Sequence, residues 1–175
     1  MAKEETKDLI QFLKPFPENV MEITLWLREF IWDFYPQSNE LIYDNYNALA
    51  IGFSLTDKAG DVFCSIAVYS KHVNLGFNRG SEIADPKKIL KGEGSLYRHL
   101  TIKEKSDVPT QYIKILPKEA YKNAFTKLKG KPQSLKGKTI IKFKDNSFLY
   151  RISNAVIFSF DPQTINIFTW CRHIV

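Results

Sequence analysis

Residues 48–77 read ALAIGFSLTDKAGDVFCSIAVYSKHVNLGF and decide the fold of this 175-residue chain. Two apolar stretches, Ala48–Leu55 and Val62–Tyr69, flank the turn-forming segment TDKAGD, and a third stretch, His72–Phe77, follows after two residues. The third stretch alternates polar and apolar residues, which is the period of a half-buried strand. Because such short connections join antiparallel neighbours, the segment predicts three strands of one antiparallel sheet.

Segments with a helical period surround these strands. Residues 3–13 predict a short amphipathic helix that ends before Pro15, and residues 18–35 predict a longer helix that begins after Pro17 and ends before Pro36. The apolar stripe expected to face the core consists of Val20, Ile23, Leu27, Phe30, Ile31 and Phe34.

Further elements are expected downstream of these three strands. The patterns predict one helical turn at 85–90, a strand at 97–103, a short helix at 107–116 and a clearer helix from Pro117 to about Lys129. Closer to the C-terminus, four short strands are expected at 138–144, 148–152, 156–160 and 165–170.

Together these patterns predict an α+β fold, with helices packed on one face of an antiparallel sheet. We expect one domain over residues 1–130, followed by a basic linker and a β-rich C-terminal extension over 131–175. A composition of 44% hydrophobic and 25% charged residues is that of a globular protein. Because the longest apolar runs are far shorter than the roughly 20 residues of a membrane span and Met1–Asp8 lacks a signal pattern, we expect a cytoplasmic protein without a membrane partner.

The net charge of +6 comes from one part of the chain. Ten lysines and a single acid, Glu119, lie between Lys114 and Lys144. The centre of that stretch, Lys127–Lys138, reads KLKGKPQSLKGK, which has the composition of a linker. A solvated hinge is the simpler interpretation, because no aromatic residue lies among these lysines, and weak contact with nucleic-acid phosphates is the alternative.

Motifs for catalysis, metal binding or cofactor binding are missing from the sequence. The histidines His72, His99 and His173 lack metal-ligand spacing, and neither a phosphate-binding loop nor a nucleophile elbow occurs. Cys64 and Cys171 cannot form a disulfide framework, and Cys64 lies among apolar strand residues, where a core thiol is expected. The sequence therefore predicts no metal and no cofactor, and it favours a non-enzymatic protein.

One stretch of the sequence contains more polar and charged residues than the packing of a sheet requires. If the strands around His72 and His99 are antiparallel neighbours, guanidinium forks, lysines and imidazoles would gather where they could hold a carboxylate or phosphate. Ordinary exposed strand polarity is the alternative interpretation. The residues predicted to bind an anionic small ligand are Lys71, His72, Arg79, Tyr97, Arg98 and His99.

An ordered series of short motifs runs through the same part of the chain. It consists of Tyr69–Phe77, Arg79-Gly80, Asp85-Pro86, Leu90–Gly94 and Arg98–Ile102. Over about residues 9–130 this series resembles the YdhG-like family of small domains of unknown function. The resemblance implies helices packed on one antiparallel sheet and brings no catalytic residues.

Some members of that family have been likened to frataxin-type iron chaperones, which gives an alternative function. The helix expected at 18–35 carries four carboxylates on the side opposite its apolar stripe, where they could hold a cation loosely. A solvated helix face is the simpler interpretation, because the four are spread over roughly 22 Å of helix axis. These residues are Glu18, Glu22, Glu29 and Asp33.

Overall fold

The computed structural model describes residues 7–45, 48–128 and 137–143. These residues form one six-stranded sheet with the order β5-β4-β3-β2-β1-β6. Neighbouring strands among β1 to β5 are antiparallel to one another, whereas β6 is parallel to β1. The predicted α+β class is confirmed, and the sheet is mixed because of this last strand. The strands are β1 (Asn39–Asn45), β2 (Ala48–Ser54), β3 (Val62–Val68), β4 (Val73–Phe77), β5 (Arg98–Ile102) and β6 (Thr139–Phe143).

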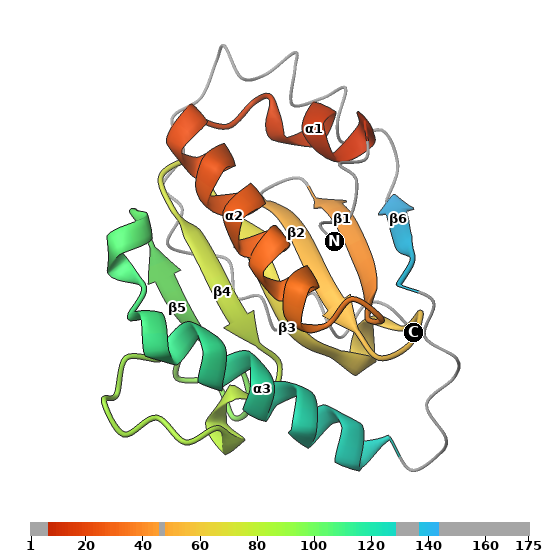
Figure 1. Cartoon of the computed structure of the whole chain (residues 1–175). Coiled ribbons are helices and arrows are strands. Elements are labelled where there is room, and N and C mark those ends of the chain that lie inside the picture. Colours follow the sequence, from red (N-terminus) through yellow and green to blue (C-terminus); the bar gives the residue numbers. More distant parts are fainter. Residues whose placement is uncertain (1–6, 46–47, 129–136, 144–175) are drawn as a thin grey trace.

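Three α-helices accompany the sheet, and Figure 1 shows α2 and α3 on the same side of it. The helices are α1 (Lys7–Leu13), α2 (Glu18–Phe34) and α3 (Thr110–Lys127). Short 3-10 turns lie at Ala59–Asp61, Gly80–Glu82 and Lys105–Asp107. Helix α2 has the predicted bounds to within one residue, since Pro17 can precede a first turn but Pro36 cannot continue the last one.

The main core lies between the helices and one face of the sheet. Ile51 on β2 is opposite Ile42 on β1 and Ile66 on β3, so strand alternation lines up a continuous apolar face. Leu27 and Ile31 of α2 pack into the same core and are fully buried. We call the side that faces α2 and α3 the helix face, and the opposite side the second face.

The second face carries mostly small and polar side chains near its centre. The register places Ala50, Gly52, Ser65, Ala67 and Gly76 on this face. Toward β6 it also carries a smaller buried cluster of Leu41, Tyr43 and Val62. The two faces of the sheet therefore differ, since bulky aliphatic side chains dominate only the helix face.

Several predicted boundaries are wrong for identifiable reasons. Helix α3 begins at Thr110 after Pro109, and it contains Pro117, which the sequence pattern placed at a helix start. Residues 85–90 form a single turn, closed by a 3.0 Å bond from the Lys88 nitrogen to the Asp85 carbonyl, and not a helix. The Asp85 carboxylate accepts hydrogen bonds from the backbone nitrogens of Ile89 (3.1 Å) and Leu90 (2.8 Å) that follow. Strand β1 was not predicted at all.

Strand β6 joins the sheet after the lysine-rich linker. The Glu40 nitrogen donates to the Lys138 carbonyl at 2.8 Å, and the Gly137 nitrogen donates to the Gln37 carbonyl at 3.2 Å. Residues 137–143 thus continue the sheet of the first 130 residues. The expectation of a separate β-rich extension over 131–175 stays a prediction, because the other strands expected there lie outside the described residues. Across the described ranges, no helix has the length and apolar character that crossing a membrane requires.

Candidate functional site

The two histidine-bearing segments are neighbouring strands, as the sequence predicts. In the β4–β5 pair, Asn74 is opposite Thr101 and Gly76 is opposite His99. Since Val73 and Leu75 point into the main core, the residues that alternate with them, His72 included, lie on the second face. His72 and His99 therefore share one face of two adjacent strands.

Each imidazole stacks on a tyrosine ring. The ring centroids of Tyr69 and His72 are 4.8 Å apart, with 20° between the planes, across a hairpin closed by a 3.0 Å bond from the Tyr69 nitrogen to the His72 carbonyl. The Tyr97 and His99 centroids are 5.8 Å apart, with 30° between the planes. Tyr97 also covers Gly76, where an added Cβ would lie 2.0 Å from the tyrosine oxygen. Each imidazole of the pair therefore lies against an aromatic ring.

Two lysines complete the group. Lys91 is held beside His99 by a backbone bridge, in which its nitrogen donates to the His99 carbonyl at 2.7 Å and its carbonyl accepts from the His99 nitrogen at 2.9 Å. Lys103 follows Ile102, the residue opposite Val73, and so reaches the end of β5 beside His72. We call His72, Lys91, His99 and Lys103 the cation cluster.

The electrostatics of the cation cluster favour neutral imidazoles. Burial lowers the pKa of His72, and the charges of Lys103 and Lys91 lower it further. Burial also lowers the pKa of His99, with further contributions from Lys91 and His72. Because the charges that contribute are all cations, the two imidazoles are neutral at pH 7 and gain a proton only with difficulty.

The cluster also contains buried polar atoms that lack a partner. Within the described part of the chain, neither Nδ1 of His99 nor Oδ1 of Asn74 has a hydrogen-bond partner. The Asn74 side chain is 6% exposed, so bulk water does not solvate this oxygen freely. Buried polar atoms without partners are costly, which makes this the part of the sheet where a polar ligand or a water would be stabilising.

Not all of the predicted ligand-binding residues meet here. His72, Tyr97 and His99 do, and Lys71 lies exposed in the adjoining hairpin turn. Arg79 does not, because its Nε lies 3.0 Å from both carboxylate oxygens of Glu82 in a contact of its own.

Arg98 is also directed elsewhere. It is opposite Phe77, a residue of the main core, so strand alternation places it on the helix face while His99 lies on the second face. Its NH1 donates to the carbonyls of Gly94 (2.5 Å) and Tyr97 (2.7 Å). The structure brings in Lys91, Lys103 and Asn74 instead, which sequence reasoning missed.

We call the exposed carboxylates of α2 the acidic ridge, which consists of Glu18, Glu22, Glu29 and Asp33. The acidic ridge does not form a metal site. Its four carboxylates are all exposed along the helix, and in residues 7–45, 48–128 and 137–143 no group of three or more His, Cys, Asp or Glu side chains could hold a metal ion. The iron-chaperone alternative therefore stays a prediction from sequence. The same holds for nucleic-acid contact through Lys127–Lys138, because residues 129–136 lie outside the described ranges.

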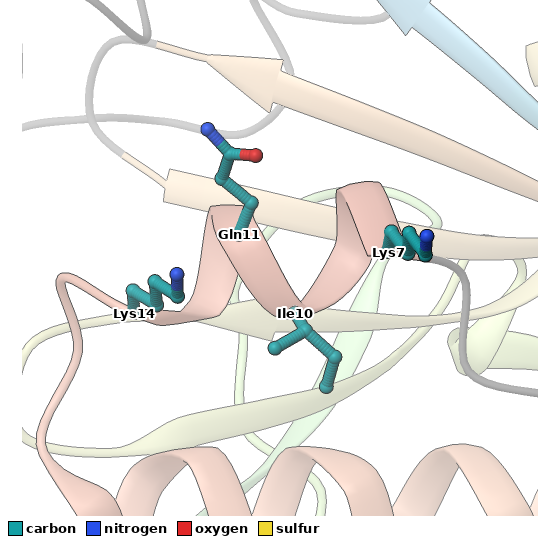
Figure 2. A pocket seen from close by; sticks show the side chains of 4 residues that line it. All are labelled: Lys7, Ile10, Gln11 and Lys14. Atoms are coloured by element: carbon teal, nitrogen blue, oxygen red, sulfur yellow. The ribbon is translucent and has the colours of Figure 1, made fainter.

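A hollow of about 410 Å³ lies beside α1, away from the cation cluster. Figure 2 shows its lining residues, with Gln11 and Ile10 pointing in opposite directions from the helix. A lining on one short helix gives no converging set of polar groups. The residues are Lys7, Ile10, Gln11 and Lys14.

Comparison with known proteins identifies no relative, since no family model, no curated protein and no solved structure matches this chain. The resemblance to the YdhG-like family therefore stays a prediction, and the functional argument depends on the geometry of the second face.

Proposed function

We propose that this protein is a non-enzymatic binding or accessory protein that holds an anionic small molecule at the cation cluster. The observation that carries the proposal is that His72 and His99 lie partly buried on one face of the β4–β5 pair, where the charges of Lys91 and Lys103 act on them. A carboxylate or phosphate placed there would neutralise the repulsion among these groups.

The same groups supply directional hydrogen bonds to an anion. Neutral imidazoles each carry one N–H donor, and lysine ammonium groups carry three. Nδ1 of His99 is buried without a hydrogen-bond partner among the described residues, and in one tautomer it carries an N–H whose cost of burial a ligand would remove. Asn74 lies two residues along β4 from His72 and adds an acceptor for a hydroxyl or protonated group. These donors and this acceptor together suit a small ligand that bears both an acid and a hydroxyl.

One acid lies near the cluster but is already engaged. The Asp107 carboxylate accepts hydrogen bonds from the backbone nitrogens of Lys103 (2.8 Å) and Glu104 (3.0 Å). These bonds lower its pKa, and the charges of Lys103 and Lys91 lower it further. Because Asp107 binds backbone groups, it leaves the lysine ammonium groups available to a ligand.

The arrangement supports binding better than catalysis. General-base catalysis by histidine uses a third group to orient the imidazole toward a nucleophile. Among the described residues, the imidazoles of His72 and His99 each stack on a tyrosine ring, and no carboxylate is hydrogen-bonded to either. Cys64 cannot serve as the nucleophile, because it is fully buried in the main core.

Calorimetric titration of the full chain with inorganic phosphate and with citrate tests the proposal. We expect binding of both anions that weakens as salt is added, because the lysine charges of the cluster attract the anion. The double variant Lys91→Gln/Lys103→Gln should lose most of the affinity, whereas Lys58→Gln, an exposed lysine in the β2–β3 connection, should not. Absence of heat and of thermal stabilisation at millimolar concentrations of both anions would refute the proposal.

A further inference from the structure

The outward face of α2 carries charges of one sign. Its four acidic residues are all exposed, and its single basic residue, Arg28, is 4% exposed and bound to Glu40. All charged side chains on the outward face of α2 are therefore acidic. The four residues are Glu18, Glu22, Glu29 and Asp33.

An aromatic row borders these acids. The ring centroids of Trp26 and Phe30 are 6.5 Å apart, and those of Phe30 and Phe34 are 4.9 Å apart. At roughly 100° per residue, the row lies about 90° around the helix from the centre of the acidic ridge. The row ends on Phe34, whose side chain is 50% exposed. Helix α2 thus presents an apolar strip beside a negative edge.

Helix α3 presents the opposite combination. Phe125 and Ile115 are 45% and 48% exposed, and with Phe34 they are the large hydrophobic residues most exposed in the described part of the chain. The one acid of α3, Glu119, is engaged by a 2.9 Å bond from the Ala84 nitrogen. Helical periodicity places Phe125 and Ile115 on the same outward arc as three exposed lysines. These are Lys114, Lys118 and Lys122.

The two outward faces belong to one surface. Tyr35, which ends α2, stacks on Tyr121 of α3 with ring centroids 4.8 Å apart. Tyr121 in turn stacks on Phe125 at 6.2 Å. Figure 1 shows the end of α2 against α3 on the side of the sheet that both helices cover. The surface therefore consists of an acidic half and a basic half, each with exposed aromatic side chains.

We propose that this surface binds a second copy of the chain in a two-fold symmetric dimer. The symmetry lays the acidic face of α2 from each copy on the lysine face of α3 from the other, so that the same complementary contact forms twice. Pairing of like helices would instead place acids against acids. The exposed phenylalanines come together between the charged edges and lose their contact with water.

The size of the surface sets the expected strength. Two helices of 17 and 18 residues are each about 26 Å long, so their outward faces offer roughly 500–600 Å² per copy. This is below the roughly 800 Å² per partner of a standard interface, and a dissociation constant of about 1–100 μM is expected. Because the charged edges are exposed, the dimer should weaken as salt is added.

Charge reversal on one helix at a time tests the proposal by sedimentation velocity of the full chain. In a dimer of the Glu29→Lys/Asp33→Lys variant, lysines on α2 of each copy face lysines on α3 of the other. In a dimer of the Lys118→Glu/Lys122→Glu variant, acids on α2 of each copy face acids on α3 of the other. Each variant alone should dimerise at least about tenfold more weakly than the natural chain. A one-to-one mixture of the two should regain the dimer, because opposite charges then face each other in both halves.

The outcomes separate this proposal from its alternatives. A natural chain that stays monomeric at about 200 μM in low salt would show that both faces are solvated, and would overturn the proposal. A dimer unaffected by either variant would assign the interface to another surface and would overturn it as well. Circular dichroism and thermal unfolding check that both variants fold. Since the cation cluster lies on the other face of the sheet, phosphate binding should be unchanged in both variants, which separates this test from that of the proposed function.

Discussion

Arg28 and Glu40 form a buried ion pair that joins α2 to β1. The Arg28 Nε lies 2.6 Å from one Glu40 oxygen and its NH2 lies 3.0 Å from the other, while the two side chains are 4% and 0% exposed. Trp32 Nε1 donates to the first oxygen at 3.3 Å and Thr139 Oγ1 to the second at 2.8 Å. Each carboxylate oxygen thus accepts two hydrogen bonds, and the network connects α2, β1 and β6.

Replacing one partner of this pair should be strongly destabilising. Glu40→Leu leaves the Arg28 charge buried without its carboxylate, and we expect a loss of about 3–5 kcal/mol in the free energy of unfolding, measured by urea denaturation. Thr139→Val removes one neutral donor and should cost only about 1 kcal/mol. The double variant Arg28→Met/Glu40→Leu should recover most of the loss. A Glu40→Leu chain as stable as the natural one would contradict the structural role of the pair.

Gly76→Ala should disturb the candidate site through its packing. The added Cβ would lie 2.0 Å from the Tyr97 oxygen and 2.7 Å from its ring carbon Cζ, so the ring must leave its position over β4. We expect a loss of about 1–3 kcal/mol in stability, measured by thermal unfolding, together with weaker phosphate binding. Gly60→Ala is the matched control, because nothing lies within 4 Å of a Cβ added there. An equal effect of both substitutions would argue against the tight contact.

The strands that sequence predicts are those with a clear alternation or a clear turn. Strand β1 was missed because its apolar residues Leu41, Ile42 and Tyr43 are consecutive, since both faces of this strand are buried. Glu40 made the strand harder to recognise, because a charged residue is not expected at a fully buried strand position. Its burial depends on its ion pair with Arg28, which lies on another element. In α3, Pro117 suggested a helix start, whereas the helix in fact continues through it.

The candidate site was predictable only where strand alternation determines it. The two-residue period places His99 on one face and Arg98 on the other, so these two predicted residues could not converge. Lys91 carried no such signal, because a backbone bridge from a loop brings it to the edge of β5. Arg79 was misleading, because its partner Glu82 lies three residues away in a 3-10 turn.

The Cys64 thiol should be unreactive in the folded protein. It is fully buried in the main core, and burial raises the pKa of the thiol well above its usual value, so thiolate is scarce. In a Cys171→Ser chain, we expect no labelling by a thiol reagent under native conditions and complete labelling in denaturant. Rapid native labelling of that variant would contradict the burial of Cys64. The natural chain serves as a control for the reactivity of Cys171.

Stability should fall as the solution becomes acidic, in a range set by the two histidines. The pKa values of His72 and His99 are lowered in the folded state, so the unfolded chain binds more protons below its histidine pKa of about 6.5. The stabilising contribution of the neutral imidazoles is therefore complete above about pH 6.5 and is lost as the pH falls below it. The melting temperature should decrease between about pH 7 and pH 5, and the decrease should be smaller in His72→Asn/His99→Asn.

The pH dependence that Glu82 contributes to stability falls in a lower pH range than that of the two histidines. Hydrogen bonds from Arg79 and Lys127 lower its pKa to about 2, so its contribution has the same sign but is lost only below the usual carboxylate pKa. Glu82→Gln should therefore leave the decrease between about pH 7 and pH 5 intact and change the profile only below about pH 4.5. A melting temperature that stays constant or rises from pH 7 to pH 5 in the natural chain would show that the two imidazoles are not held neutral by the fold.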